Sequence, residues 1–371
     1  MLIVNYFPNF VLKYKKRDRI IEDVKWSWAC RILVDNDYYL IDDFSLKPDA
    51  GDLVLVKIEK ISQHNSIIVY NNKKLRLYPG DLIVGILGNR YATDVFEGKV
   101  DGLNNLCLMT NGGLVSTLKS KNSSAKKPTT VSFLGYISNK DGAKINLKHN
   151  FLNPKQKFSN RLHSGFPKNV VLVVGTGMNS GKTTIVRMLI RSLHDKNVNV
   201  CACKLTGSVS NRDKTEMESS LANRVIDFSD YGFPSTYMCA KNELITLFYT
   251  MLNDLNKSNP DVIVMEIADG ILQRETEFLL NEQGVKEHVC GVALAADNSP
   301  SALFSLSYLR NLNFNVFFLS GTITSSPLYI QEFQKNTNYL IPVISSSSDE
   351  ELKPISNSII KFLSIKENLI K

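Results

Sequence analysis

Residues 170–187 read VVLVVGTGMNSGKTTIVR, and this stretch decides the fold of the second half of the chain. A continuous apolar run is typical of a buried strand, and the small residues after it indicate a tight turn before a helix. The run from Thr176 to Thr183 has the spacing of a P-loop, with threonine in place of the usual first glycine. Converging backbone N–H groups and the positive helix N-terminus bind phosphate, so the stretch predicts a nucleoside-triphosphate site.

Two side chains of this loop have expected roles. Lys182 is expected to reach the β- and γ-phosphates, and the hydroxyl of Thr183 is expected to ligate Mg²⁺. The expected nucleotide-binding residues are Thr176, Gly177, Met178, Asn179, Ser180, Gly181, Lys182, Thr183 and Thr184.

The chain has 371 residues and a net charge of +8, which predicts about two domains. No apolar run approaches the roughly 18 residues that span a bilayer, and the charges near the N-terminus follow the apolar stretch, unlike a secretory signal. We therefore expect a cytoplasmic protein without a membrane partner. The six cysteines are scattered, and Cys201 and Cys203 are expected to be core residues of a strand rather than metal ligands.

Sequence patterns change near residue 150. Residues 26–150 contain short β-branched and aromatic segments between Gly, Pro, Asn and Asp, whereas strands alternate with helix-length segments from residue 169 on. We expect an α/β protein whose P-loop domain has a mostly parallel sheet covered by helices, preceded by a smaller β-rich, barrel-like domain. The expected domains are residues 1–150, a linker at 151–168, and the P-loop domain at 169–371, which ends in a helical tail after Pro354.

The front half carries most of the excess positive charge, with 22 lysines and arginines against 15 acidic residues in 1–150. Much of it lies in two runs, KYKKRDR (13–19) and LKSKNSSAKKP (118–128). Such runs are usually solvated loops, and the alternative is a surface for a polyanion. Apart from Tyr14, the aromatic residues are not interleaved with these runs, so no stacking platform for single strands is evident along the sequence.

The form GT-x4-GKTT, together with CACKLTG (201–207) and DVIVMEIADG (261–270), resembles dethiobiotin synthetase and its relatives. The resemblance covers about residues 169–345. It implies that Lys204 lies beside the substrate and the γ-phosphate and that Glu266 binds magnesium. Independently, both residues follow apolar strands, which places them at the carboxyl edge of the sheet, where open α/β folds bind ligands.

Three further parts of the site stay open at the level of sequence. The acidic residue that joins Glu266 on the metal is Asp213 or Asp227; we favour Asp213, because the neighbouring Arg212 could face phosphate. Ser235 and Thr236, in DFSDYGFPSTY (227–237), either line a substrate pocket or simply belong to a turn. No segment that selects the base is evident, so ATP is expected, with GTP as the alternative.

Two main functions fit these features. The favoured one is Mg²⁺-dependent phosphoryl transfer or ligase-type activation of a small-molecule acceptor, in which Lys182, Lys204 and Glu266 form the catalytic set. The alternative is an NTP-hydrolysing switch whose basic N-terminal domain binds nucleic acid or a protein. A scaffold that binds nucleotide without turnover is a third reading. Relatives of this fold commonly pair their nucleotide sites, so a homodimer is expected.

Overall fold

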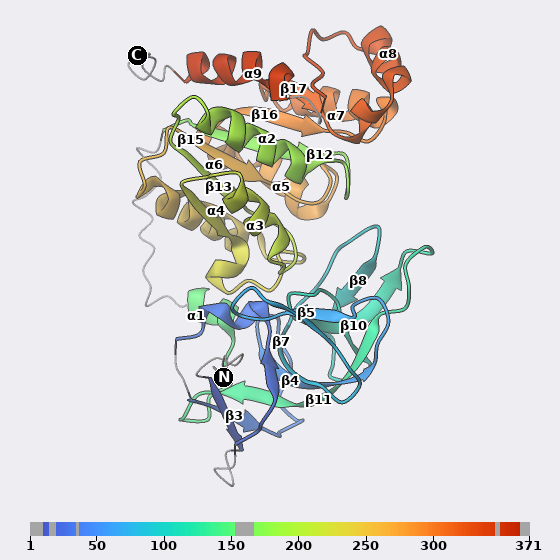
Figure 1. Ribbon diagram of the computed structural model, residues 1–371, viewed down its shortest axis with the longest axis vertical. Coiled ribbons are helices and arrows are strands. Elements are labelled where there is room, and N and C mark those ends of the chain that lie inside the picture. Colours follow the sequence, from blue (N-terminus) through green and yellow to red (C-terminus); the bar gives the residue numbers. More distant parts are fainter. Residues whose placement is uncertain (1–9, 15–19, 35–36, 153–166, 346–348, 364–371) are drawn as a thin grey trace, which may run out of the picture. The chain divides into compact units, whose positions relative to one another are not determined.

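A computed structural model describes residues 10–14, 20–34, 37–152, 167–345 and 349–363. The chain forms two compact units, each described by itself below (Figure 1). The first comprises Met1–Gln156, Ser208–Asn211 and Phe228–Met238, and the second comprises the remaining segments. Most of the expected linker, residues 153–166, lies outside the described residues, as do residues 15–19 of the first basic run.

The first unit is built on a nine-stranded sheet with the order β1-β3-β11-β4-β7-β10-β8, in which β2 pairs with β7. The short strand β9 pairs with both β10 and β11, so the sheet curls back on itself. The strands are β1 (Val11–Tyr14), β2 (Val24–Trp26), β3 (Asp37–Ile41), β4 (Leu53–Lys60), β7 (Leu82–Leu87), β8 (Phe96–Lys99), β9 (Leu106–Leu108), β10 (Leu114–Lys121) and β11 (Thr129–Ser138). The unit also contains a separate hairpin, β5 (Ser66–Ile68) with β6 (Lys74–Arg76), the helix α1 (Leu147–Leu152) and two short 3-10 helices, Trp28–Ile32 and Phe228–Tyr231.

Both faces of β4 are buried, which makes this strand the centre of the unit. Leu53 and Leu55 point into one apolar cluster, while Val54, Val56 and Ile58 point into another, as the two-residue period of a strand requires. The expected β-rich front region is therefore present, with a core on each side of the sheet.

Two short segments from the second half of the chain, Ser208–Asn211 and Phe228–Met238, belong to this first unit. Val209 is fully buried in its core, and Arg31 Nη2 donates to Asp230 Oδ1 at 2.6 Å. The division at 150 and 169 was inferred from changes in composition, which cannot register insertions of a few residues. The first unit is thus discontinuous in sequence.

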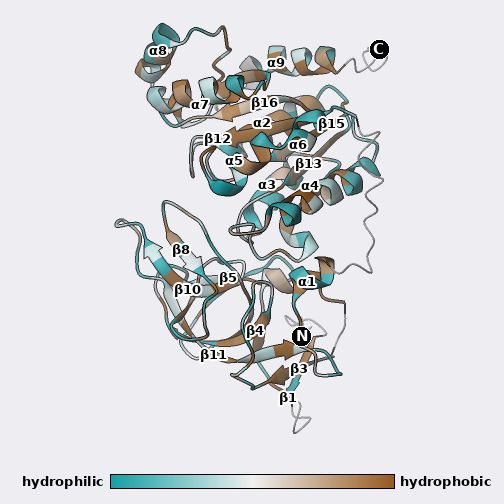
Figure 2. Ribbon diagram, turned by 180° about the vertical axis from the view of Figure 1, so that it is seen from behind, coloured by the Kyte–Doolittle hydropathy of each residue, from teal (hydrophilic) through white to brown (hydrophobic). Residues whose placement is uncertain are grey.

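The second unit holds a six-stranded, fully parallel sheet with the order β14-β13-β15-β12-β16-β17. Figure 2 shows β12 as strongly hydrophobic, and every residue of β12, β15 and β16 is buried. The strands are β12 (Val170–Gly175), β13 (Val200–Lys204), β14 (Arg224–Asp227), β15 (Val262–Glu266), β16 (Val289–Ala295) and β17 (Val316–Ser320). The expected α/β fold is confirmed.

Eight helices of the described part of the chain surround this sheet (Figure 1). Apolar residues of α2, α3 and α9 join one cluster with the sheet, so these three helices cover the same face. The helices are α2 (Lys182–His194), α3 (Arg212–Ser219), α4 (Lys241–Asn256), α5 (Arg274–Asn281), α6 (Gln283–His288), α7 (Ser299–Asn311), α8 (Pro327–Asn336) and α9 (Asp349–Phe362). The tail is helical as expected, but α9 begins before Pro354 and contains it. None of the described helices has the length and apolar character that a bilayer crossing requires.

His64 is a partly buried histidine of the first unit. Its Nδ1 lies 2.9 Å from Asn111 Oδ1, which requires an N–H on Nδ1, and Arg90 Nη1 lies 3.5 Å from Nε2. Burial, together with the nearby positive charge of Arg90, lowers the pKa of His64 from 6.5 to about 4. The folded state therefore favours the neutral form of His64.

The unfolded chain takes up this proton near pH 6.5 and the folded chain only near pH 4. The free energy of unfolding should therefore fall by about 3 kcal/mol as the pH drops through that window. Both tryptophans of the chain, Trp26 and Trp28, lie in the first unit, so their fluorescence in urea titrations reports its unfolding. We expect His64→Gln to flatten the pH dependence, whereas the exposed His149→Gln should not. An unchanged pH dependence in His64→Gln would contradict this account.

Candidate nucleotide-binding site

The phosphate loop joins β12 to α2, with Gly175 ending the strand and Lys182 beginning the helix. Gly181 caps the helix with a φ of 107°, and Asn179 has a φ of 61°; both lie in the left-handed region that lets the loop turn sharply. A Cβ on Gly175 would lie only 2.3 Å from Ser180 Oγ. The loop therefore closes tightly on the strand that carries it.

Lys182 is folded into this loop. Its Nζ donates to the carbonyl of Gly177 at 2.6 Å, and the residue is only 6% exposed. Burial lowers the pKa of Lys182, while Glu266 and Asp269 act in the opposite direction. The amine is therefore held against the backbone of the loop.

Lys204 lies between two carboxylates at the carboxyl edge of the sheet. It ends β13 and is in register with Glu266, which ends β15. Its Nζ lies 3.3 Å from Glu266 Oε1 and forms an ion pair with Asp213 Oδ2. Asp213 also accepts a hydrogen bond from Thr183 Oγ1 at 3.1 Å. Four side chains from four different elements therefore meet beside the phosphate loop.

Each of these charged groups shifts the pKa of its neighbours. Burial alone would lower the pKa of Lys204, but the carboxylates of Asp213 and Glu266 outweigh it and raise that pKa, so the ammonium stays charged. Burial would raise the pKa of Asp213, yet Lys204 and Thr183 hold it below its usual range. Burial is the dominant effect on Glu266 and raises its pKa, because only part of that cost is offset by Lys204.

One atom of this cluster has no hydrogen-bond partner in the described part of the chain. Glu266 Oε2 is buried, and the whole residue is 1% exposed. An orphaned buried carboxylate oxygen is costly unless something binds it. Among the described residues no group of three or more His, Cys, Asp or Glu side chains could hold a metal. Mg²⁺ needs no such group, since it commonly takes one or two carboxylates and completes its shell with phosphates and water. Thr183, Asp213 and Glu266 fit that ion.

The remaining residues expected from sequence divide into two groups. Arg212 begins α3 and its charge contributes to lowering the pKa of Asp213, while Asp227 ends β14 in register with Lys204. Ser235 and Thr236 lie in Phe228–Met238 and belong to the first unit. Of the two acidic candidates, Asp213 is the one that accepts a hydrogen bond from Thr183, so it remains our preferred partner of Glu266; the roles of Arg212, Ser235 and Thr236 stay predictions.

Three residues of the site were not expected from sequence. Asp269 is close enough to act electrostatically on both buried lysines, Asp297 Oδ1 accepts a hydrogen bond from Thr176 Oγ1 at 2.8 Å, and Gly321 packs behind the loop. Each follows the carboxyl end of a strand by a few residues. That position is the signal that could have found them, because all carboxyl ends of a parallel sheet meet at one edge.

The strand order, the loop geometry and the lysine within the loop together define the second unit. It is a P-loop NTPase fold. No protein-family model matches the chain, and no curated protein matches it either.

Several solved structures align with part of this chain. The signal recognition particle receptor FtsY from Elizabethkingia anophelis aligns over 60% of this chain and 75% of its own, with 13% identity and a TM-score of 0.34. HypB from Helicobacter pylori, solved with nickel, aligns over 53% and 86%, with 13% identity and a TM-score of 0.35. PAB0955, a GTPase from Pyrococcus abyssi in its apo form, aligns over 54% and 100%, with 12% identity and a TM-score of 0.34.

At these identities and TM-scores the likeness carries no inference about activity. None of these three structures is a dethiobiotin synthetase, and the resemblance to that family remains a prediction from the motifs.

Gly321 offers a direct test of how tightly the loop is supported. It has a φ of 102°, and a Cβ there would lie 2.2 Å from the carbonyl oxygen of Ser180 and 2.8 Å from that of Ala296. We expect Gly321→Ala to lower the free energy of unfolding by about 1–3 kcal/mol through backbone strain. Gly177 lies in the phosphate loop itself, and a Cβ there would meet no atom within 4 Å. Gly177→Ala is therefore the matched control. Thermal unfolding without nucleotide measures both; equal melting temperatures for the two variants would refute the packing described here.

Proposed function

We propose that this protein is a Mg²⁺-dependent enzyme that binds a nucleoside triphosphate and cleaves or transfers its γ-phosphoryl group. The observation that carries the proposal is the cluster of Lys204, Asp213 and Glu266 beside Thr183 and the phosphate loop. Phosphoryl transfer depends mainly on positioning and on neutralising charge, and this cluster supplies both signs of charge in a buried setting.

Each residue has a proposed part in the reaction. Lys182 would leave the carbonyl of Gly177 and donate to the β- and γ-phosphates. Thr183, Asp213 and Glu266 would hold Mg²⁺, which when bound offsets negative charge on the phosphate oxygens. Lys204 is anchored by both carboxylates, so its charge is fixed near the γ-phosphate without the loss of side-chain freedom that an exposed lysine would incur.

Two fates of the γ-phosphoryl group remain. In the first, a carboxylate or similar nucleophile of a small molecule accepts it, as the dethiobiotin synthetase-like motifs suggest, and we favour this one. In the second, water accepts it and the protein acts as a switch. That reading is favoured by one observation: the segments that follow β13 and β14, Ser208–Asn211 and Phe228–Met238, are built into the first unit. ATP is the proposed nucleotide, with GTP as the alternative, and a homodimer is the proposed assembly.

The first experiment measures binding of fluorescent ATP and GTP analogues and release of phosphate from ATP and GTP with Mg²⁺. We expect Lys182→Ala to lose at least about 100-fold in turnover while it retains the wild-type circular dichroism spectrum. Lys335→Ala, an exposed lysine of α8, is the control and should behave as wild type.

The outcomes separate the two fates. Turnover without an acceptor supports the switch, whereas tight binding that yields product only with a carboxylate-bearing acceptor supports phosphoryl transfer. If the wild-type protein binds neither nucleotide, or if Lys182→Ala binds and turns over normally, the proposal fails.

The proposed metal ligands have a separate test. We expect Glu266→Gln to reduce the enhancement of nucleotide affinity by Mg²⁺ at least about 10-fold, because the buried oxygen would lose its charge. Glu277→Gln, an exposed residue of α5, is the matched control. Titration of the nucleotide in Mg²⁺ and in EDTA measures the enhancement, and an unaltered Mg²⁺ effect in Glu266→Gln would exclude this residue as a ligand.

A further inference from the structure

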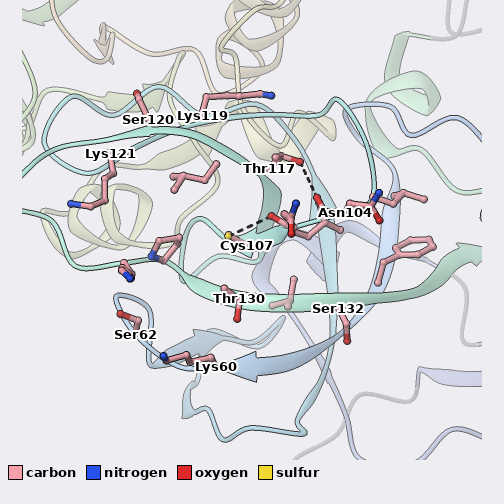
Figure 3. Close-up of a pocket in the computed structure, with 18 of the residues that line it drawn as sticks. Lys60, Ser62, Asn104, Cys107, Thr117, Lys119, Ser120, Lys121, Thr130 and Ser132 are labelled. Atoms are coloured by element: carbon pink, nitrogen blue, oxygen red, sulfur yellow. Dashed lines mark hydrogen bonds between the residues drawn. The ribbon is translucent and has the colours of Figure 1, made fainter.

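The first unit contains a groove of about 1360 Å³ (Figure 3). It runs between the end of β10 and the strand β11, with the end of β4 at one side and the segment 103–107 at its base. A groove of this size exceeds the roughly 300–1,000 Å³ of ordinary small-molecule pockets. Its volume leaves room for a ligand larger than an ordinary small molecule.

The walls of the groove are strongly basic. Among the described residues that line the groove, five are lysines and none is acidic. The lysines are Lys60, Lys119, Lys121, Lys126 and Lys127.

Two of the five lysines already form an ion pair or hydrogen bonds within the chain. Lys119 forms an ion pair with Asp101, and Lys121 Nζ donates to the carbonyls of the following loop, including that of Ala125 at 3.0 Å. Lys60, Lys126 and Lys127 are exposed, and no ion pair involves them within the described ranges of the chain. These three ammonium groups are therefore available to neutralise a polyanion.

The floor of the groove is apolar, and an aromatic ring stands at its rim. Leu106 and Val131 are buried beneath it. Phe44 is 61% exposed, and its ring packs edge-on against Phe133, with centroids 5.2 Å apart and an interplanar angle of 83°. The contact with Phe133 restricts the orientation of Phe44, and most of the surface of Phe44 remains exposed.

Side-chain hydroxyl and amide groups also line the groove. Ser120 Oγ already donates to Glu97 at 3.2 Å and Ser132 Oγ to Glu59 at 2.6 Å, so these two hydroxyls can offer a ligand only an acceptor. Figure 3 shows several of the hydroxyl and amide groups on both sides of the groove; the full set is Ser62, Asn104, Asn105, Thr117, Ser120, Thr130 and Ser132.

We propose that this groove binds single-stranded nucleic acid. Lysines along the walls match a chain of phosphates, the exposed ring of Phe44 matches the flat face of a base, and the hydroxyl and amide groups match base edges. An acidic polypeptide would use the same lysines but would draw nothing from an exposed aromatic ring, so the ring favours the nucleic acid. Net positive charge without acidic residues in the lining also disfavours a neutral ligand.

The tertiary structure brings together residues that are distant in sequence. Lys126 and Lys127 belong to one basic run, whereas Phe44 and Lys60 come from other loops and strands. This is why the stacking partner was not evident from the basic runs themselves. Lys15 and Lys16, in the other run, lie outside the described residues.

The test is fluorescence anisotropy of a labelled 12-nucleotide oligothymidylate with the full-length protein and no NTP, so its result does not depend on the proposed function. We expect the triple variant Lys60→Gln, Lys126→Gln, Lys127→Gln to bind at least 10-fold more weakly at 50 mM salt. The slope of log affinity against log salt should fall by about 2, since each phosphate contact on a single strand contributes about 0.7. Phe44→Ala should weaken binding about 5- to 100-fold without changing that slope, and Phe44→Trp should restore it.

The matched control neutralises three exposed lysines of the same unit outside the groove, as Lys47→Gln, Lys74→Gln, Lys140→Gln. It removes the same charge and should retain most of the affinity. Equal losses in the two triple variants would overturn the proposal, because binding would then reflect overall charge. Competition by poly-glutamate as effective as that by unlabelled oligonucleotide would indicate an acidic protein partner instead, and absence of binding by the wild-type protein would refute the site outright.

Discussion

Lys204 holds two carboxylates together at the edge of the parallel sheet, and the candidate site is organised around that ion-pair network. Without it, Asp213 and Glu266 would place two negative charges in a buried region beside a third polar group, Thr183. Removing one partner of a buried pair leaves an uncompensated charge, which is far costlier than the pair itself. Within the described part of the chain, the network leaves Glu266 Oε2 without a hydrogen-bond partner.

The parallel sheet makes this network possible. Residues that end β13 and β15 are in register, so Lys204 and Glu266 lie side by side although 62 positions separate them in the chain. The same edge receives the phosphate loop from β12 and Asp297 from the end of β16. Strand pairing alone is therefore enough to bring residues from four strands into one site.

The two units use charge in different ways. At the candidate site of the second unit, Lys182 is buried against the Gly177 carbonyl and Lys204 is ion-paired with two carboxylates, which restricts the positions of both ammonium groups. In the first unit, Lys60, Lys126 and Lys127 are exposed along a groove. Exposed ammonium groups attract anions over several ångströms, and salt weakens that attraction. Such a division suits a protein in which nucleotide chemistry and partner binding take place in separate parts of the fold.

The amino-acid sequence by itself determined the fold class of the second unit and the core of its site. Apolar runs that end in GTGMNSGKTT, Lys204 and Glu266 are local signals, because strand, turn and helix tendencies depend on near neighbours. Other features were decided only by the tertiary structure. Asp269 and Gly321 join the site, Val209 enters the core of the first unit, and Phe44 meets the basic groove through contacts between segments far apart in the chain. No local pattern encodes such contacts, because they depend on which strands pair and on where the turns return the chain.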